Sequence, residues 1–152
     1  MEKVLFLDLE ETVIRSWDNP LFCNTDFILD VLKKENVKQV HIYSFAIYND
    51  HDKEIFEKTM KAGLEQHLGV EILSWMSIKE LMKKVFFYNG VVFDQNEFIT
   101  VWGKVKSFHD FCSGEFSNME CILVDDVVPN SRFELPDKNL VIRTIKVPFK
   151  SH

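Results

Sequence analysis

Two acidic clusters in this chain each follow a short apolar run. Asp8 follows the apolar residues 4–7, and Asp125 and Asp126 follow the apolar residues 121–124. Such runs are typical of buried strands, and in an open α/β sheet the ends of separate strands converge on one binding crevice. Each cluster alone is equally compatible with the common use of Asp in turns and helix caps. Together they favour a site at which carboxylates meet.

Carboxylates that share one crevice repel one another unless a hard cation neutralises them. An oxygen-rich site with room for water suits Mg²⁺, and that cation would also attract a phosphate group. Two more polar residues are placed to join the site: Ser44 ends the strand-like residues 40–43, and Lys104 lies between that strand and the second acidic cluster. The sequence therefore predicts a magnesium and phosphate site.

Two lysines near the start of one predicted helix could supply a positive charge to this site. Lys104 is in line with Phe108 and Phe111, at i+4 and i+7 of a predicted helix, so it faces the sheet. Lys106 is in line with the polar Asp110, where a solvated lysine is the ordinary interpretation. We favour Lys104 and keep Lys106 as the alternative.

The elements that would position these side chains alternate between strand and helix. Strand patterns occur at residues 4–7, 37–43, 70–75, 121–124 and 140–147. Helical patterns occur at residues 25–36, where Thr25 is the expected cap, and at 51–68, 77–84 and 104–116. This alternation predicts a three-layer, Rossmann-like α/β fold with a mainly parallel, five-stranded sheet and right-handed crossovers. If the fourth strand lies beside the first, both acidic clusters flank one crevice.

A small insertion is predicted after the third strand. The dipeptide Asn-Gly at 89–90 separates the apolar residues 85–88 and 91–93, which is the strongest local signal for a hairpin. A further turn leads to residues 98–102, so we expect a small antiparallel β-meander here.

The bulk properties are those of one globular domain over residues 1–152. The chain is 46% hydrophobic, with 14 Phe, which is enough to form a core. A net charge of −6 provides no electrostatic basis for non-specific nucleic-acid binding or for an anionic membrane surface. The three cysteines show no metal-ligand spacing, and no secretory leader or membrane span is recognisable. We expect a cytoplasmic protein with reduced thiols.

In their order along the chain, these residues resemble the signatures of the haloacid dehalogenase (HAD) superfamily. Residues 8–12, Asp-Leu-Glu-Glu-Thr, look like its first signature, Asp-x-Asp-x-Thr. Ser44, Lys104 and the pair at 125–126 match the remaining three signatures in order, and Asn130 completes an Asp-Asp-x-x-x-Asn pattern that is also typical of the family. The resemblance spans essentially the whole chain and implies a HAD-like fold and a small, capless phosphatase.

The resemblance implies phosphoryl transfer through an aspartyl-phosphate. Asp8 would be the nucleophile, while Mg²⁺ bridges its carboxylate and the phosphate. Ser44 would hydrogen-bond a phosphoryl oxygen, and Lys104 would clamp the nucleophile and the phosphate. Asp125 would bind the metal, and Asp126 would bind it directly or through water.

Glu10 departs from the family pattern. The family has Asp at this position, where it protonates the leaving oxygen and then activates water; its contact with the metal is made by the backbone carbonyl. Glu10 keeps a carboxyl group but reaches one methylene further. Because a misplacement on the order of 1 Å can cost about a hundredfold, we expect turnover to be reduced or absent.

Three functions follow from these expectations. The first is a Mg²⁺-dependent phosphomonoester hydrolase. Only 36 positions separate Asp8 from Ser44, too few for a cap domain. The family resemblance implies that a member without a cap has an open site and often accepts large substrates, so the candidates are a nucleotide, a phosphoprotein, a nucleic-acid end and a sugar phosphate. The second is a catalytically impaired phosphate- or protein-binding module. The third, a receiver-type phosphoacceptor domain, fits less well because such domains carry the acceptor on a later strand.

One loop leaves two interpretations open. Residues 13–24 are rich in turn formers and carry the apolar side chains of Trp17, Leu21 and Phe22. They would form either a partial lid over the site or local packing on the sheet.

Overall fold

The apolar residues 4–7 form the end of the central strand, β1 (Glu2–Leu7), in the computed structural model, which describes residues 1–90 and 94–148. Side chains of β1 alternate between two cores: Leu5 and Leu7 are buried in one, and Phe6 in the other. A strand that is covered on both faces reads as a continuous apolar run, because both sets of side chains are buried.

The sheet has six strands in the order β3-β2-β1-β4-β6-β5. The other strands are β2 (Gln39–Ile42), β3 (Glu71–Trp75), β4 (Met119–Asp125), β5 (Ser131–Leu135) and β6 (Leu140–Lys146). All neighbours are parallel except β5 and β6. Strand β4 lies directly beside β1, with Leu7 opposite Val124, so the two acidic clusters leave the sheet at the same edge.

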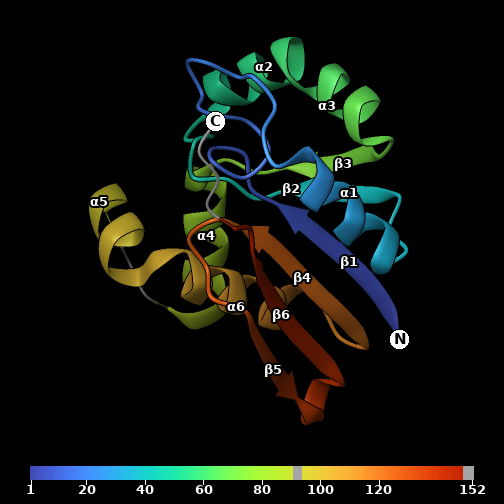
Figure 1. Cartoon of the computed structure of the whole chain (residues 1–152). Helices are drawn as coiled ribbons and strands as arrows, with labels where there is room; N and C mark the ends of the chain where they lie inside the picture. Colours follow the sequence, from blue (N-terminus) through green and yellow to red (C-terminus); the bar gives the residue numbers. More distant parts are fainter. Residues whose placement is uncertain (91–93, 149–152) are drawn as a thin grey trace.

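Helices cover both faces of the sheet (Figure 1). One core joins the sheet to α1 (Thr25–Lys34), α2 (Asp50–Thr59) and α3 (Lys61–Leu68). The other joins it to α4 (Ile78–Asn89) and α6 (Gly103–Glu115). This is the predicted three-layer α/β arrangement with a mostly parallel sheet. None of the helices in the described part of the chain has the length and apolar character that a bilayer crossing requires.

The predicted number of five strands is wrong, because β5 adds an antiparallel strand at the edge. Four of its five residues are exposed, so its sequence lacks the apolar alternation of a half-buried strand. Backbone pairing with β6 supplies the order instead, and a 3-10 turn at Pro136–Lys138 closes the hairpin.

The predicted β-meander is also wrong wherever its residues are described. Ser77 and Glu80 form a capping box, with each side chain bonded to the other's backbone N–H, and the helix that they start continues to Asn89. Gly90 then ends this helix in the left-handed region, at φ 76°, so the Asn-Gly pair is a helix terminus rather than a hairpin turn. Residues 91–93 lie outside the described residues, and 95–102 are helical, as the short α5 (Gln95–Glu97) and the π-helical η1 (Phe98–Trp102).

Two helix predictions need smaller corrections. The predicted helix at 51–68 is two helices, because the backbone leaves helical geometry at Met60, with φ −125°. Asn24, rather than Thr25, is the cap residue of α1. Thr25 has a different role, since its hydroxyl lies 2.9 Å from Nε2 of His67 and ties α1 to α3.

A buried carboxylate ties α1 to the opposite end of the sheet from the acidic clusters. Glu35, at the end of α1, accepts hydrogen bonds from Lys3 and from Arg143, each at 2.9 Å. Arg143 also donates to Glu120, at 2.8 Å. The hydrogen bond from Arg143, which outweighs the opposing effect of burial, and the bond from Lys3 lower the pKa of Glu35 from 4.5 to about 2.

Replacing this carboxylate is expected to destabilise the fold. We expect Glu35→Gln to lower the free energy of unfolding by about 2–3 kcal/mol, because it leaves Arg143 and Lys3 without their charged partner. The folded pKa lies below the unfolded value, so the ion pairs stabilise the fold fully above pH 4.5 and lose their effect as the pH falls to about 2. Urea unfolding at several pH values should show the gap between wild type and variant closing over this range.

The matched control is an exposed ion pair on the edge strand. Glu134 pairs with Arg132 at 3.1 Å, but both side chains are more than half exposed. Glu134→Gln should therefore change the unfolding free energy by less than about 0.5 kcal/mol. If the two substitutions lower the free energy of unfolding equally, the buried Glu35 network stabilises the fold no more than an exposed ion pair does.

Candidate active site

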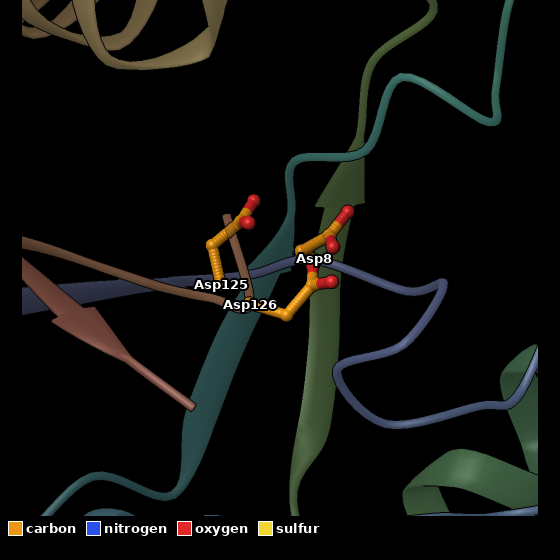
Figure 2. Close-up of side chains that lie close together, drawn as sticks. All are labelled: Asp8, Asp125 and Asp126. Carbon is orange, nitrogen blue, oxygen red and sulfur yellow. The ribbon is translucent and has the colours of Figure 1, made fainter. Parts of the chain in front are cut away.

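Three carboxylates meet where β1 and β4 end. Asp8, Asp125 and Asp126 each offer an oxygen, and these oxygens lie within 4.8 Å of one another. Figure 2 shows the three side chains gathered beyond the sheet, with Asp8 delivered by one strand and the pair by its neighbour. The sequence prediction that remote acidic segments converge here agrees with this geometry.

Backbone hydrogen bonds fix the positions of these residues. The N–H of Asp8 donates to the carbonyl of Val124 at 3.0 Å, so β1 and β4 stay paired up to the site. The N–H of Val127 donates to Oδ1 of Asp125 at 2.8 Å, which turns the chain sharply after the strand. Asp125 is fully buried and Asp8 is 4% exposed, so little freedom is left to either carboxylate.

Lys104 lies between two of the carboxylates. Its Nζ is 2.6 Å from Oδ1 of Asp8 and 2.5 Å from Oδ2 of Asp125. Burial disfavours the ammonium, but the charges of Asp8 and Asp125 outweigh this effect and raise the pKa of Lys104. Phe108 and Phe111, which share its helix face, are buried in the core, as the helical spacing predicts.

Lys106, the alternative, points elsewhere. Its Nζ lies 3.8 Å from the centre of the Trp102 ring, in a cation–π contact. The two lysines lie two residues apart in α6, so the helical period places them on different faces of the helix.

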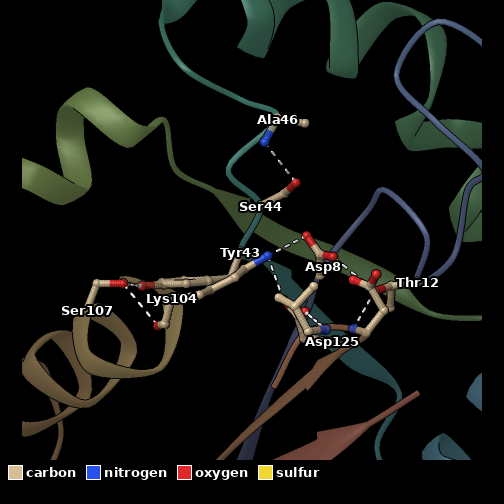
Figure 3. A network of polar contacts seen from close by, with 10 residues as sticks. Asp8, Thr12, Tyr43, Ser44, Ala46, Lys104, Ser107 and Asp125 are labelled. Atoms are coloured by element: carbon tan, nitrogen blue, oxygen red, sulfur yellow. Dashed lines mark hydrogen bonds and ion pairs between the residues drawn. The ribbon is translucent and has the colours of Figure 1, made fainter. Parts of the chain in front are cut away.

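A relay of two hydrogen bonds, through Ser107 and Tyr43, holds the backbone of Lys104 in place (Figure 3). The hydroxyl of Ser107 donates to the backbone carbonyl of Lys104 at 3.0 Å, and it lies 2.7 Å from the hydroxyl of Tyr43. Burial raises the pKa of Tyr43 well above its ordinary value, so this group stays a neutral hydroxyl. Sequence reasoning did not identify this relay, because nothing in the spacing of residues 43 and 107 predicts their contact.

Thr12 connects the two acidic clusters. Its hydroxyl donates to Oδ2 of Asp8 at 2.9 Å and lies 3.3 Å from Oδ1 of Asp126. The backbone N–H of Asp126 in turn donates to the same hydroxyl, at 3.1 Å. Thr12 is fully buried, so it orients both carboxylates rather than meeting a substrate. Its place in the Asp-x-Asp-x-Thr-like segment was the signal that could have identified this role.

Two of the three clustered carboxylates, Asp8 and Asp126, border a cavity of about 480 Å³. Its polar wall is formed by Asp8, Glu10, Glu11, Ser44, Lys104 and Asp126. Ser44 follows β2, and its hydroxyl accepts a hydrogen bond from the N–H of Ala46 at 3.2 Å. The structure therefore brings Ser44 and Lys104 to the same cavity as the carboxylates.

Glu10 also borders the cavity but is anchored away from the carboxylate cluster. Its Oε2 accepts a hydrogen bond from the backbone N–H of Trp17, at 2.7 Å. Within the described residues, the group of acidic oxygens close enough to share an ion contains Asp8, Asp125 and Asp126, and Glu10 is not part of it. Glu10 thus lies at the cavity with its carboxylate held by the loop.

The loop that holds Glu10 packs locally. Trp17 packs against the core on the α1 side of the sheet, and the ring of Phe22 stacks on His67, with centroids 4.0 Å apart. Asn24 donates to the backbone carbonyls of Glu11 and Thr12, which ties the end of the loop to its start. Local packing is therefore the better description of residues 13–24 than a lid over the cavity.

The site carries excess negative charge. Burial and the charge of Asp8 raise the pKa of Asp125, although Lys104 opposes them. Burial, followed by the charges of Asp8 and Asp125, raises the pKa of Asp126 to about 7. A single lysine is thus insufficient to neutralise three neighbouring carboxylates, and a divalent cation would relieve the remaining repulsion.

The donors suit a hard cation. All are carboxylate oxygens, the ligands that Mg²⁺ prefers, and sulfur or imidazole ligands are absent from this group of described residues. The three cysteines are buried and unpaired elsewhere in the chain. The residues present therefore fit a magnesium ion.

A larger hollow, of about 940 Å³, lies at the opposite end of the parallel strands. Of its acidic side chains, Glu35 bonds Lys3 and Arg143, and Glu71 accepts from Gln39. The clustered carboxylates lie at the smaller cavity, which we take as the candidate active site.

Comparisons with protein-family models, with curated proteins and with solved structures find no match to this chain.

Proposed function

We propose that this protein is a Mg²⁺-dependent phosphomonoester hydrolase that works through an aspartyl-phosphate on Asp8. The observation that carries the proposal is the meeting of Asp8, Asp125, Asp126 and Lys104 at the carboxyl ends of adjacent parallel strands. The ordered resemblance to the HAD signatures supports the same activity and a HAD-like, capless fold. The lack of any helical or sheet domain between Asp8 and Ser44 beyond one loop, α1 and β2 is consistent with an open site.

Three side chains would hold the metal. Asp8, Asp125 and Asp126 supply its carboxylate ligands, and by the family resemblance the backbone carbonyl of Glu10 adds a further contact. When bound, the ion offsets the charge that develops on the transferred phosphoryl group. Lys104 supplies a fixed positive charge beside Asp8 and Asp125, and the hydroxyl of Ser44 would donate to a phosphoryl oxygen.

In the first half-reaction a carboxylate oxygen of Asp8 attacks phosphorus. The bond from phosphorus to the ester oxygen breaks, and the phosphoryl group is transferred to Asp8. The carboxyl group of Glu10 gives its proton to the departing alkoxide, which leaves as the alcohol. Thr12 and Lys104 hold Asp8 at a fixed position during this step.

The second half-reaction releases phosphate. The carboxylate of Glu10 takes a proton from water as the water oxygen attacks phosphorus, and the bond to Asp8 breaks. Asp8 is regenerated as a carboxylate and Glu10 as an acid, so the cycle closes. Both roles require the Glu10 carboxyl group to leave the N–H of Trp17, which makes the loop a determinant of the rate.

The same hydrogen bond favours a second candidate function. If Glu10 stays bonded to Trp17, the chain binds metal and phosphate without turning over, as a phosphate- or protein-binding module. Metal binding is common to both candidates, and proton transfer by Glu10 separates them.

Removal of the metal tests the proposal. We expect purified protein to release inorganic phosphate from an aryl phosphate in the presence of Mg²⁺, and excess EDTA to reduce the rate by at least about 10³-fold. Added Mg²⁺ should restore it, whereas Ca²⁺, which prefers more ligands, should not. Calorimetric Mg²⁺ binding without phosphate release would instead support the binding module.

A further inference from the structure

Part of the cavity lining is apolar, and we call these residues its apolar wall. Its members are Phe45, Ala46, Ile99 and Val127, in contrast to the charged side chains of the polar wall. An apolar side chain that borders a charged site is seldom required by the reaction itself. We therefore asked what part of a substrate this wall would meet.

The wall is fixed relative to the reacting groups. Phe45 follows Ser44 directly, and its ring lies 5.3 Å from Nζ of Lys104. Val127 follows Asp126, and its backbone N–H is held by the buried carboxylate of Asp125. A group bonded to a phosphate at Asp8 would thus extend along Phe45 and Val127.

A third member of the wall comes from the helical segment after α5. Ile99 belongs to η1, and its neighbour Phe98 is fully buried against Phe45, with ring centroids 5.7 Å apart. Ile99 itself is half-buried at the cavity, while Val127 is 68% exposed at its mouth. Exposed apolar side chains at the mouth of a site mark a surface that is suited to an apolar ligand.

The charged side chains around the cavity also favour an uncharged group on the substrate. Four carboxylates, those of Asp8, Glu10, Glu11 and Asp126, border the cavity, and Lys104 is its sole cation among the described residues. Lys104 is already paired with Asp8 and Asp125. A second phosphate or a carboxylate on the substrate would therefore face acidic side chains with no positive charge to receive it.

From these observations, and on the basis of the proposed function, we infer that the substrate is a phosphate monoester of an uncharged, apolar alcohol or phenol. Phe45, Ile99 and Val127 would select it. The same wall and charges discriminate against nucleoside polyphosphates and nucleic-acid ends, which carry further negative charge beside the scissile group.

Matched alkyl esters test the inference. Hexyl phosphate and the same ester ending in a carboxylate have similar reacting ends and differ in terminal charge, and methyl phosphate is too short to reach the wall. We expect kcat/KM for hexyl phosphate to exceed that for either of the other esters by about tenfold or more. Release of inorganic phosphate with Mg²⁺ at about 0.15 M salt is the measurement.

Substitutions at the mouth then locate the wall. Val127→Ser should lower the ratio of kcat/KM for hexyl over methyl phosphate about threefold. Val127→Lys should raise the ratio of kcat/KM for the carboxylate ester over kcat/KM for hexyl phosphate about tenfold, because the lysine supplies a positive charge to the carboxylate. Val101→Lys is the matched control: Val101 is 78% exposed, lies two residues from Ile99 on another face of η1, and does not border the cavity.

The outcomes separate the inference from the proposed function. Turnover of none of the alkyl esters, with the aryl phosphate still hydrolysed, overturns the inference alone, and turnover of no phosphate ester, the aryl phosphate included, overturns both. Mg²⁺-dependent turnover of all three with equal kcat/KM overturns the inference and leaves the hydrolase standing. If Val127→Lys and Val101→Lys give the same ratio of kcat/KM for the carboxylate ester over hexyl phosphate, the apolar wall does not select the substrate.

Discussion

Asp8→Asn is expected to lower Mg²⁺-dependent phosphate release by at least about 10³-fold, because an amide cannot act as the nucleophile or carry the phosphoryl group. The substitution keeps the size of the side chain, and the amide oxygen can still accept a hydrogen bond from Thr12. Phosphate release by protein prepared identically is the measurement. A turnover above about one tenth of wild type that still depends on Mg²⁺ would rule out Asp8 as the nucleophile.

Stability should respond in the opposite sense to activity. Asp8 is a source of the repulsion that raises the pKa of both Asp125 and Asp126. Removing its charge relieves that repulsion, so the free energy of unfolding without metal should stay level or rise by about 1 kcal/mol. Lys104 keeps its ion pair with Asp125 at 2.5 Å.

A matched control removes a carboxylate that has no place in the site. Asp137 is exposed in the 3-10 turn between β5 and β6. Asp137→Asn has the same chemistry as Asp8→Asn and should leave phosphate release unchanged. Loss of activity in both variants would indicate a general effect of the preparation instead of a nucleophile at position 8.

The second large effect is expected at Glu10. Glu10→Gln keeps the length of the side chain and an oxygen that can accept from the N–H of Trp17, but it cannot transfer a proton. We expect kcat to fall by about 10²–10⁴-fold. With an aryl phosphate, whose leaving group needs little acid assistance, Asp8 should still be phosphorylated, so intact-protein mass spectrometry should detect one added phosphoryl group.

Glu10→Asp restores the residue that the HAD signature has at this position. The shorter side chain withdraws the carboxyl group from Trp17 and returns it towards Asp8, so we expect turnover about tenfold faster than wild type. Glu57→Gln, on the exposed surface of α2, is the control and should change neither rate nor phosphorylation. Slower turnover in Glu10→Asp would mean that catalysis depends on the hydrogen bond to the loop.

These two positions also separate the candidate functions. If wild-type protein releases no phosphate but the Glu10→Asp variant does, the protein is a binding module that lacks turnover because of the longer side chain at position 10. A wild-type protein whose activity needs both Asp8 and Glu10 would identify the enzyme. Mg²⁺ binding should persist in Glu10→Gln in either case, because the three clustered carboxylates are retained.

The location of the site was predictable from local patterns. Residues 5–7 and 121–124 are buried on both faces of the sheet, and burial of this kind leaves a continuous apolar run that can be recognised without coordinates. Parallel strands that share an edge deliver the residues after them to one place, so Asp8 and Asp125 meet as expected. The period of α6 similarly turns Lys104, and not Lys106, towards the carboxylates.

The two wrong predictions have different causes. The Asn-Gly pair at 89–90 satisfies both a hairpin and a helix terminus, and the capping box twelve residues earlier, itself a local signal, selects the helix. Strand β5 has little buried side-chain surface, so its existence depends on the backbone of β6. A sequence pattern reports the burial of an element's own side chains, so it does not indicate a strand that is held by a partner's backbone.

The sequence by itself determined which residues could perform chemistry here and at which edge of the sheet they gather. Only the tertiary structure decided how these residues are held. Thr12 hydrogen-bonds Asp8 and lies beside Asp126, and the backbone of Lys104 is held by the hydrogen bonds of Ser107 and Tyr43. The backbone N–H of Trp17 donates to Glu10. Residue type and strand order set the chemistry, because they fix what is delivered to the edge. Hydrogen bonds depend on distances of a few tenths of an ångström between segments that sequence patterns do not relate, so their partners appear only once the chain is folded.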